Sequence, residues 1–322
     1  MKVLITGGAG FIGFHLAKIL INNGFKVYLT DIIDPNNFDK ELKVLISQNN
    51  CEYIECNLLN FNQIKKIKNN YDIIFHLAAI VGVENVISDS YGVLTKNQIM
   101  LSNIIDISKE QTKKPRLIFT STSEVYAGSQ FNKSITYPTP EDSLLILPDL
   151  SKPRTSYMLS KLYGEAMCQA SGLDFLILRP HNIFGPRMGM KHVIPQLIKK
   201  ILFTPKNGTL DIYSPNHTRT FCYVNYAVEK IYNLISSSNF EDKVLNLGIS
   251  EPEIKIKELS KILLKVAKRN DIFINELENT EGSPSRRVPD TTKLINSSDH
   301  INIPSLIEGI TKTFDWYKNF LD

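Results

Sequence analysis

The segment GGAGFIG, residues 7–13, follows a short apolar run, KVLIT, and precedes a stretch with apolar residues at helical spacing. Glycine at these positions lets backbone N–H groups and the N-terminus of the following helix approach a pyrophosphate. A strand, a glycine loop and a helix in this order are typical of a nucleotide-binding βα unit. We therefore predict that Gly7, Gly10 and Gly13 bind a dinucleotide, together with Phe11 and Ile12 of the same turn.

Asp31 ends the next predicted strand, at the distance of about twenty residues that such a unit requires. A carboxylate there accepts from the hydroxyls of the adenosine ribose and would repel a 2′-phosphate, and no arginine follows in DIID. NAD is therefore predicted in preference to NADP. Further cofactor contacts are predicted after the next two strands, at Asn57, Leu58, Ala78 and Ala79. An ordinary turn residue remains the alternative for Asn57, and we interpret His76 as packed in the sheet.

Short apolar runs alternate with amphipathic stretches over the first half of the chain. We expect strands at residues 2–6, 26–30, 53–55, 72–76, 116–120 and 175–179, and helices near 10–23, 60–69, 91–110 and 154–171. This alternation predicts an α/β fold with a doubly wound parallel sheet of the Rossmann type. Residues 1–180 are predicted to form the NAD-binding domain and residues 181–322 a smaller substrate-binding α/β lobe, with interleaved boundaries. The Pro-rich stretch 128–152 is predicted to contact substrate.

Composition argues against several other classes of protein. The chain carries 37 Lys+Arg against 33 Asp+Glu, a net charge of +4, and no Arg-rich run interleaved with aromatic residues, so nucleic-acid binding is not expected. The 4 cysteines lack CxxC spacing, and neither a metal site nor a disulfide framework is predicted. No apolar run approaches the ~18 residues of a membrane span. We expect a soluble protein of the reducing cytoplasm.

Tyr157 and Lys161 form a YxxxK pair that places both side chains on one face of a predicted helix. Because a phenol has an unperturbed pKa of about 10, it needs a neighbouring ammonium to act as a base near neutral pH. Thr122, Ser123 and Glu124 directly follow the fifth predicted strand, at the carboxyl edge where such sheets gather ligands. We predict that these five residues are catalytic, with Thr122 orienting a hydroxyl and Glu124 acting near the adjacent carbon. The alternative is that Ser123 and Glu124 lie in a solvated turn that caps a helix.

The motifs GGAGFIG, HLAA, STSEVY, PRTSYMLSK, RPHNIFGPRMG, RTFCYV and NLG occur in this order. Across essentially the whole chain the sequence resembles the extended short-chain dehydrogenase/reductases that act on nucleotide sugars. STSEVY, FGPRM and the late RRVPD look most like the UDP-glucuronate decarboxylases. The resemblance implies that Tyr157 takes the C4 hydroxyl proton while hydride passes from C4 to NAD, and that the resulting 4-ketose loses carbon dioxide.

Other reactions of the same family remain as alternatives. A nucleotide-sugar 4,6-dehydratase resembles the chain less, because dehydratases have Asp where this chain has Ser123. A C4 epimerase is the third enzyme alternative. An NAD-binding sensor or scaffold is the non-enzyme alternative, although such a protein would have little reason to keep Thr122, Tyr157 and Lys161 together.

The resemblance also implies contacts with a nucleotide-diphosphate sugar. A guanidinium can hold a sugar carboxylate with two hydrogen bonds, and among Arg154, Arg286 and Arg287 we favour Arg154 and Arg287. Diphosphate and nucleoside contacts are implied for Asn182, Arg187, Val193 and Arg219, and a contact near the nicotinamide for Asn97. A homodimer is also implied, in which the helices near 91–110 and 154–171 pair into a four-helix bundle. Three features depart from the family pattern: Asn57 replaces a more usual Asp, Asn225 replaces an acidic residue after YV, and IVGVENV after HLAA is unlike the decarboxylases.

Overall fold

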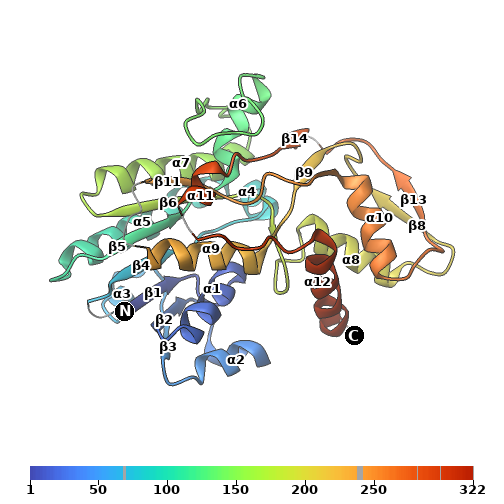
Figure 1. The fold of residues 1–322 in the computed structure, drawn as a ribbon. Helices are drawn as coiled ribbons and strands as arrows, with labels where there is room; N and C mark the ends of the chain where they lie inside the picture. The colour runs from blue at the N-terminus through green and yellow to red at the C-terminus, as the bar shows by residue number, and fades with distance from the viewer. Residues whose placement is uncertain (68–69, 238–241, 281, 298, 322) are drawn as a thin grey trace.

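A seven-stranded parallel sheet forms the larger part of the molecule in the computed structural model, which describes residues 1–67, 70–237, 242–280, 282–297 and 299–321 (Figure 1). In spatial order the strands are β11 (Val244–Leu247), β6 (Phe175–Pro180), β5 (Arg116–Thr120), β4 (Ile73–His76), β1 (Lys2–Thr6), β2 (Lys26–Asp31) and β3 (Cys51–Glu55). The strand order reverses beside β1, which opens a crevice at the carboxyl ends of β1 and β4. The predicted Rossmann-type fold is confirmed.

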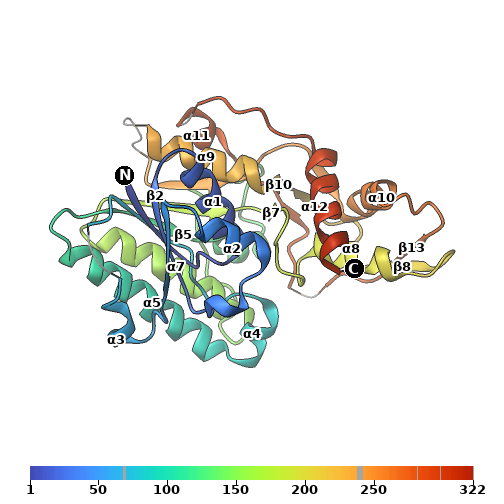
Figure 2. The ribbon, with the colours of Figure 1, turned by 90° about the horizontal axis from the view of Figure 1, so that it is seen from below.

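Helices cover both faces of this sheet (Figures 1 and 2). One core forms beneath α1 (Phe11–Asn22) and α9 (Val224–Ser236), and a second beneath α5 (Ser90–Glu110) and α7 (Arg154–Ala170). Successive residues of β1 alternate between the two, since Val3 and Ile5 join the first core and Leu4 the second. A strand buried on both faces reads as a continuous apolar run, which is why these strands are visible in the sequence. Of the short helices, α2 (Lys40–Ile46) packs on the first core and α3 (Phe61–Ile64) on the second, and α4 (Val83–Ser88) contacts α5 and α7.

The second lobe lies beside the sheet and holds small sheets with helices (Figure 1). The strands β8 (Thr209–Ile212) and β13 (Phe273–Glu276) pair in parallel, and β9 (Thr218–Thr220) lies between β12 (Glu253–Lys255) and β14 (Arg286–Arg287). Its helices are α8 (Val193–Phe203), α10 (Ile256–Val266) and α12 (Leu306–Leu321), while β7 (Ile183–Phe184), β10 (Cys222–Tyr223) and α11 (Thr292–Asn296) connect the parts. The C-terminal half of the chain also supplies β11 and α9 to the sheet layer.

The loop predicted at residues 128–152 joins the two lobes near the carboxyl edge of the sheet. It begins within the short helix α6 (Ala127–Phe131), which follows the 3-10 turn η2 (Ser123–Tyr126). Farther along, the Thr139 N–H donates to Val288 O and the Asp290 N–H donates to Thr139 O, each at 2.8 Å. These bonds fix the segment after β14 beside the segment that follows η2.

The expected helix at 60–69 is much shorter in the structure. The helix α3 covers Phe61–Ile64, and residues 68–69 of the prediction lie outside the described part. In the described ranges no helix is long and apolar enough to cross a membrane, and no group of three or more His, Cys, Asp and Glu side chains is suited to hold a metal ion.

Candidate active site

The glycine loop between β1 and α1 fits the diphosphate of NAD. Gly7 has a φ of +69°, and a Cβ there would lie 2.8 Å from Ala78 N. A Cβ on Gly13 would lie 2.4 Å from Gly7 O, so this glycine allows α1 to pack against the loop. Gly10 is the N-cap of α1 and brings no side chain, which leaves the first-turn N–H groups accessible to an anion. Phe11 and Ile12 begin α1 and are half-buried.

Asp31 ends β2 beside this loop, where a ribose of NAD would bind. Its Oδ2 accepts from the Ala9 N–H at 3.1 Å, and its Oδ1 accepts from the Ile32 N–H at 2.8 Å. Burial raises the pKa of the Asp31 carboxyl above its usual value. Each carboxylate oxygen has a second lone pair, so the side chain can also accept from the two ribose hydroxyls.

The other predicted cofactor residues are placed in different ways. Ala78 and Ala79 follow β4 and are half-buried, and Leu58 is part of the core. The Asn57 side chain is exposed and accepts from the Leu59 N–H at 3.0 Å, as in an ordinary turn. Asn97 is buried: its Oδ1 accepts from the Ile80 N–H at 2.8 Å and its Nδ2 donates to Ser160 Oγ at 3.1 Å. Asn97 therefore fixes the chain after β4 to α7.

Tyr157 and Lys161 lie on α7, and the hydroxyl of Thr122 forms a hydrogen bond with the Tyr157 phenol. Burial raises the pKa of Tyr157, and the nearby Glu124 carboxylate raises it further, whereas the Thr122 bond lowers it. Burial lowers the pKa of Lys161 to about 8. The Lys161 ammonium donates to Thr120 O at 2.8 Å and lies over the ring of Phe119. The predicted base and its ammonium thus lie one helical turn apart on α7, with the Lys161 side chain buried and the Tyr157 side chain half-buried.

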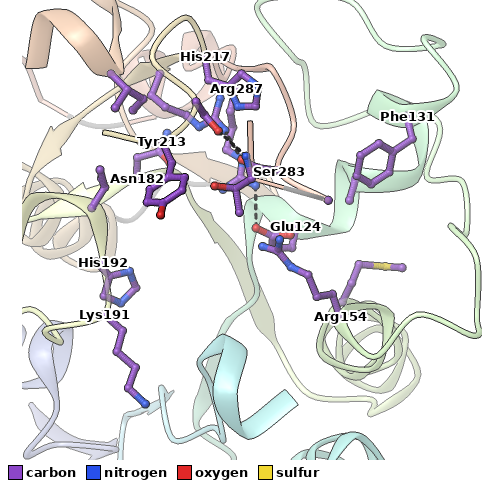
Figure 3. A pocket seen from close by; sticks show the side chains of 18 of the residues that line it. Glu124, Phe131, Arg154, Asn182, Lys191, His192, Tyr213, His217, Ser283 and Arg287 are labelled. Carbon is purple, nitrogen blue, oxygen red and sulfur yellow. Dashed lines mark hydrogen bonds and ion pairs between the residues drawn. The ribbon is translucent and has the colours of Figure 1, made fainter. Parts of the chain in front are cut away.

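Glu124 faces cations from two other segments. Arg287 of β14 donates to Glu124 Oε1 at 2.7 Å, and Arg287 is the main cause that lowers the pKa of the Glu124 carboxyl, with Arg154 contributing. Figure 3 shows Arg154 and Arg287 approaching Glu124 from different sides. Ser123 is buried at 4% exposure. The turn η2 therefore presents a carboxylate between two guanidinium groups.

A cleft of about 1240 Å³ extends from Glu124 into the second lobe (Figure 3). Its lining includes the predicted substrate residues Arg154, Asn182, Val193, Arg219 and Arg287. Asn182 has a φ of +41° and donates to Thr220 O at 3.0 Å, and Val193 begins α8. Arg219 pairs in register with Arg287 across β9 and β14, and its guanidinium donates to Thr218 O at 2.7 Å. Burial and then Arg287 lower the pKa of Arg219 to about 9.

Arg187 and Arg286 lie elsewhere. The Arg187 guanidinium pairs with Asp39 at 2.8 Å and Glu41 at 3.2 Å, and it packs on the ring of Phe14. It therefore joins the loop after β7 to α2 and is not among the residues that line the cleft. Arg286 pairs with Glu253 at 2.8 Å on the other side of β14.

A buried polar network beside the site was not evident from the sequence. Arg179 of β6 forms two hydrogen bonds to Glu165 of α7, at 2.9 and 2.7 Å, and donates to the Tyr126 hydroxyl at 2.7 Å. The Tyr126 hydroxyl donates in turn to Asn246 Oδ1 at 2.9 Å. The only available signals were a charged residue inside an apolar strand, Arg179, and a glutamate one helical turn after Lys161. The network joins α7, β6, η2 and β11.

Comparisons with known proteins agree with this geometry. The model of the NAD dependent epimerase/dehydratase family matches residues 3–248. The UDP-N-acetyl-alpha-D-glucosaminuronate decarboxylase of Bacillus cytotoxicus is 32% identical over 98% of this chain and 98% of its own. UDP-glucuronic acid decarboxylase 1 of Danio rerio is 29% identical over 100% of this chain and 73% of its own.

Among solved structures, UDP-glucuronic acid 4-epimerase from Bacillus cereus, in complex with UDP-glucuronic acid and NAD, gives a TM-score of 0.85 at 26% identity. The match covers 99% of this chain and 100% of the epimerase chain. The glycine loop, Asp31 and the Tyr157–Lys161 pair thus occur in a chain whose relatives include decarboxylases, epimerases and dehydratases of nucleotide sugars. The chain belongs to the NAD-dependent epimerase/dehydratase family and is an NAD-dependent enzyme.

Proposed function

We propose that this enzyme decarboxylates a UDP-linked hexuronic acid through a 4-keto intermediate. The observation that carries the proposal is the half-buried pair between Glu124 and Arg287, with Arg154 acting on the same carboxylate. A sugar carboxylate can replace Glu124 as the partner of Arg287, because both groups accept two parallel N–H bonds. A neutral hexose would leave these guanidinium groups without an anionic partner from the ligand.

The charge of the cleft supports an anionic sugar. Its lining includes the basic residues Lys152, Arg154, Lys191, Lys200, Arg219 and Arg287, and the acidic residues Glu124, Asp149 and Asp211. A nucleoside diphosphate joined to a uronic acid carries negative charge at both ends of the ligand. Two relatives that match nearly the whole chain are named decarboxylases of such sugars.

The residues of the site suit the first half of the reaction. NAD, when bound, supplies the hydride acceptor for C4. Tyr157 as phenolate removes the C4 hydroxyl proton, the Lys161 ammonium stabilises that phenolate, and the Thr122 hydroxyl orients the reacting oxygen. The product of this half is a ketone at C4, which makes the C6 carboxylate that of a β-keto acid.

Glu124 and Arg287 serve the second half. The C5–C6 bond breaks, its electron pair moves toward the C4 carbonyl, carbon dioxide leaves, and C5 takes up a proton. Return of the hydride to C4 then reduces the ketone, so that the overall reaction is redox-neutral. When Arg287 turns to the sugar carboxylate, Glu124 loses the main cause of its low pKa. Its carboxyl then becomes a suitable proton donor for C5, while Tyr157 and Thr122 stabilise the developing charge on the C4 oxygen.

The test is mass analysis and proton NMR of the products after incubation with NAD and separate nucleotide sugars. The panel contains UDP-glucuronate, UDP-N-acetylglucosaminuronate, UDP-glucose and GDP-mannose. We expect loss of carbon dioxide from a uronate and no reaction of the neutral sugars. The Tyr157→Phe protein is expected to lose turnover by orders of magnitude and still bind NAD. Loss of water from a neutral sugar would instead indicate a dehydratase.

A second candidate is C4 epimerisation of the same uronate. The similarity to the Bacillus cereus UDP-glucuronic acid 4-epimerase favours it, because the reported complex contains UDP-glucuronic acid and NAD. Epimerisation leaves the mass of the nucleotide sugar unchanged and alters only the NMR coupling of the C4 proton. The same panel therefore separates the two reactions.

A further inference from the structure

His181 is a buried residue next to the site to which the proposed mechanism gives no role. It follows β6 and is 1% exposed, and its Nε2 lies 3.1 Å from Asn246 Oδ1. The orientation of the Asn246 amide is fixed, because its Nδ2 donates to the carbonyls of Thr139 at 2.9 Å and Asp290 at 3.0 Å. Since Asn246 Oδ1 can only accept, Nε2 of His181 carries the proton. Nδ1 is therefore an acceptor, and this buried atom has no hydrogen-bond partner.

Arg287 has the complementary unpaired atom. Its terminal nitrogen donates to Glu124, but its Nε is buried and has no hydrogen-bond partner. Burial and then the charge of Arg287 lower the pKa of His181 to about 3. The imidazole is thus neutral at physiological pH and keeps its Nδ1 lone pair. A buried acceptor and a buried donor that both lack a partner, on segments that Asn246 joins, favour a hydrogen bond between them in another state of the site.

The NLG motif, residues 246–248, brings together the two segments that carry His181 and Arg287. Asn246 holds His181 through Oδ1 and the segment after Arg287 through the Asp290 carbonyl. A Cβ on Gly248 would lie 3.1 Å from His181 Cβ and 3.4 Å from Pro289 Cγ. Glycine therefore allows the end of β6 and the segment after β14 to approach each other here. The NLG motif is visible in the sequence, and the structure shows that it allows these two segments to pack closely.

We propose that His181 is a positioning residue for Arg287: its Nδ1 accepts the Arg287 Nε–H when Arg287 turns from Glu124 to the carboxylate of the sugar. This inference rests on the proposed function, because it assigns Arg287 to the uronate carboxylate. His181 itself touches no substrate in this account. Its effect is on how strongly the enzyme prefers a uronate to the matching neutral sugar.

The experiment measures that preference by binding, in NAD-loaded protein carrying Tyr157→Phe so that the ligand is not consumed. Isothermal titration with UDP-glucuronate and UDP-glucose gives the ratio of the two Kd values. We expect His181→Phe to reduce the preference for UDP-glucuronate about ten-fold, and Arg287→Lys to reduce it at least as much. The two changes together are expected to cost no more than Arg287→Lys alone, because both remove one interaction.

Two further variants keep the test specific. His181→Gln offers both a donor for Asn246 and an acceptor for Arg287, and we expect it to retain most of the preference; it also serves as the second variant where His181→Phe does not fold. Ser250→Ala is the matched control, since the Ser250 hydroxyl donates to Pro289 O at 2.9 Å and braces the same segment without facing the Arg287 Nε. We expect Ser250→Ala to leave the Kd ratio unchanged.

Additive losses for His181→Phe and Arg287→Lys, or an unchanged ratio in His181→Phe, would overturn the inference. Failure of the proposed function looks different, because it is read from carbon dioxide release by the unmodified enzyme. Release of carbon dioxide with additive losses overturns only the role of His181. Non-additive losses without carbon dioxide release overturn the decarboxylation and leave the role of His181 standing.

Discussion

The Lys161 side chain lies in a buried site that disfavours the charged form of its ammonium group. Burial lowers the pKa of its ammonium to about 8, and its polar contact is with the Thr120 carbonyl. The adjacent phenol of Tyr157 has a pKa raised by burial and by Glu124. An ammonium one helical turn away favours the phenolate of the reacting enzyme, so we expect its removal to raise the pKa of Tyr157 further. We predict that Lys161→Met moves the ascending limb of the kcat/KM profile to higher pH and lowers kcat about 10²-fold or more.

The matched control is Lys230→Met. Lys230 is also almost fully buried, at 2% exposure, but it lies on α9 and donates to Asp299 O at 2.9 Å. Its loss removes a buried ammonium far along the chain from Tyr157. The pH dependence of kcat/KM should be unchanged in Lys230→Met. An equal displacement of the profile in both variants would contradict the assigned role of Lys161.

At the scale of elements, α7 is fixed to the sheet by a buried ion pair. The side chains of Arg179 and Glu165 are 5% and 4% exposed, and Ser121 after β5 also donates to Glu165, at 2.5 Å. Removing one partner leaves a buried charge unpaired. We predict that Arg179→Met lowers the free energy of unfolding by about 3–5 kcal/mol in urea titrations, and that adding Glu165→Met restores part of it.

A surface ion pair between β5 and the start of β6 provides the comparison. Arg116 of β5 and Asp174, the residue before β6, form an ion pair at 2.5 Å with side chains 29% and 45% exposed. Solvent screens such a pair, so Arg116→Met should cost less than about 1 kcal/mol. Similar losses in Arg116→Met and Arg179→Met would show that burial of the Arg179 pair adds nothing.

The elements differ in how well the sequence indicates them, and the reason is burial. The strands β1 and β5 begin and end where they were expected, because each is an apolar run bounded by turn residues. The strands β9, β12 and β14 read TRT, EIK and RR, and nothing in two or three polar residues predicts pairing. Their register comes from contacts distant in the sequence, such as Arg287 opposite Arg219.

The residues of the site also differ in how well the sequence predicts them. Tyr157, Lys161, Thr122 and Glu124 lie within two short motifs, so local spacing and the family resemblance predict them together. The bond from Arg287 to Glu124 joins residues 163 positions apart and depends on where β14 lies. His181 and Asn246 gain their importance only from that arrangement. For Arg187 the motif predicts a substrate contact, and the structure places its guanidinium against Asp39 and Glu41 at α2.

At the scale of the whole molecule, α5 and α7 pack together and form the outer layer on their side of the sheet (Figure 2). Leu101, Ile104 and Ile105 of α5 are committed to the core. Large side chains nevertheless remain on the outside of the two helices: Tyr91 is 79% exposed, Ile99 47% and Tyr163 59%. An outward apolar face on two adjacent helices is suited to pair with its own copy about a two-fold axis.

We therefore predict that the protein is a dimer through α5 and α7, and that Ile99→Glu combined with Tyr163→Glu produces monomers in sedimentation equilibrium. Two carboxylates brought against their symmetry mates would be desolvated and would repel one another, which opposes association. The control is Phe203→Glu, which removes an aromatic side chain of similar exposure, 65%, from α8 of the other lobe. Its mass should match that of the unmodified protein. A monomeric unmodified protein, or a doubly substituted protein that still dimerises, would place the association surface away from these helices.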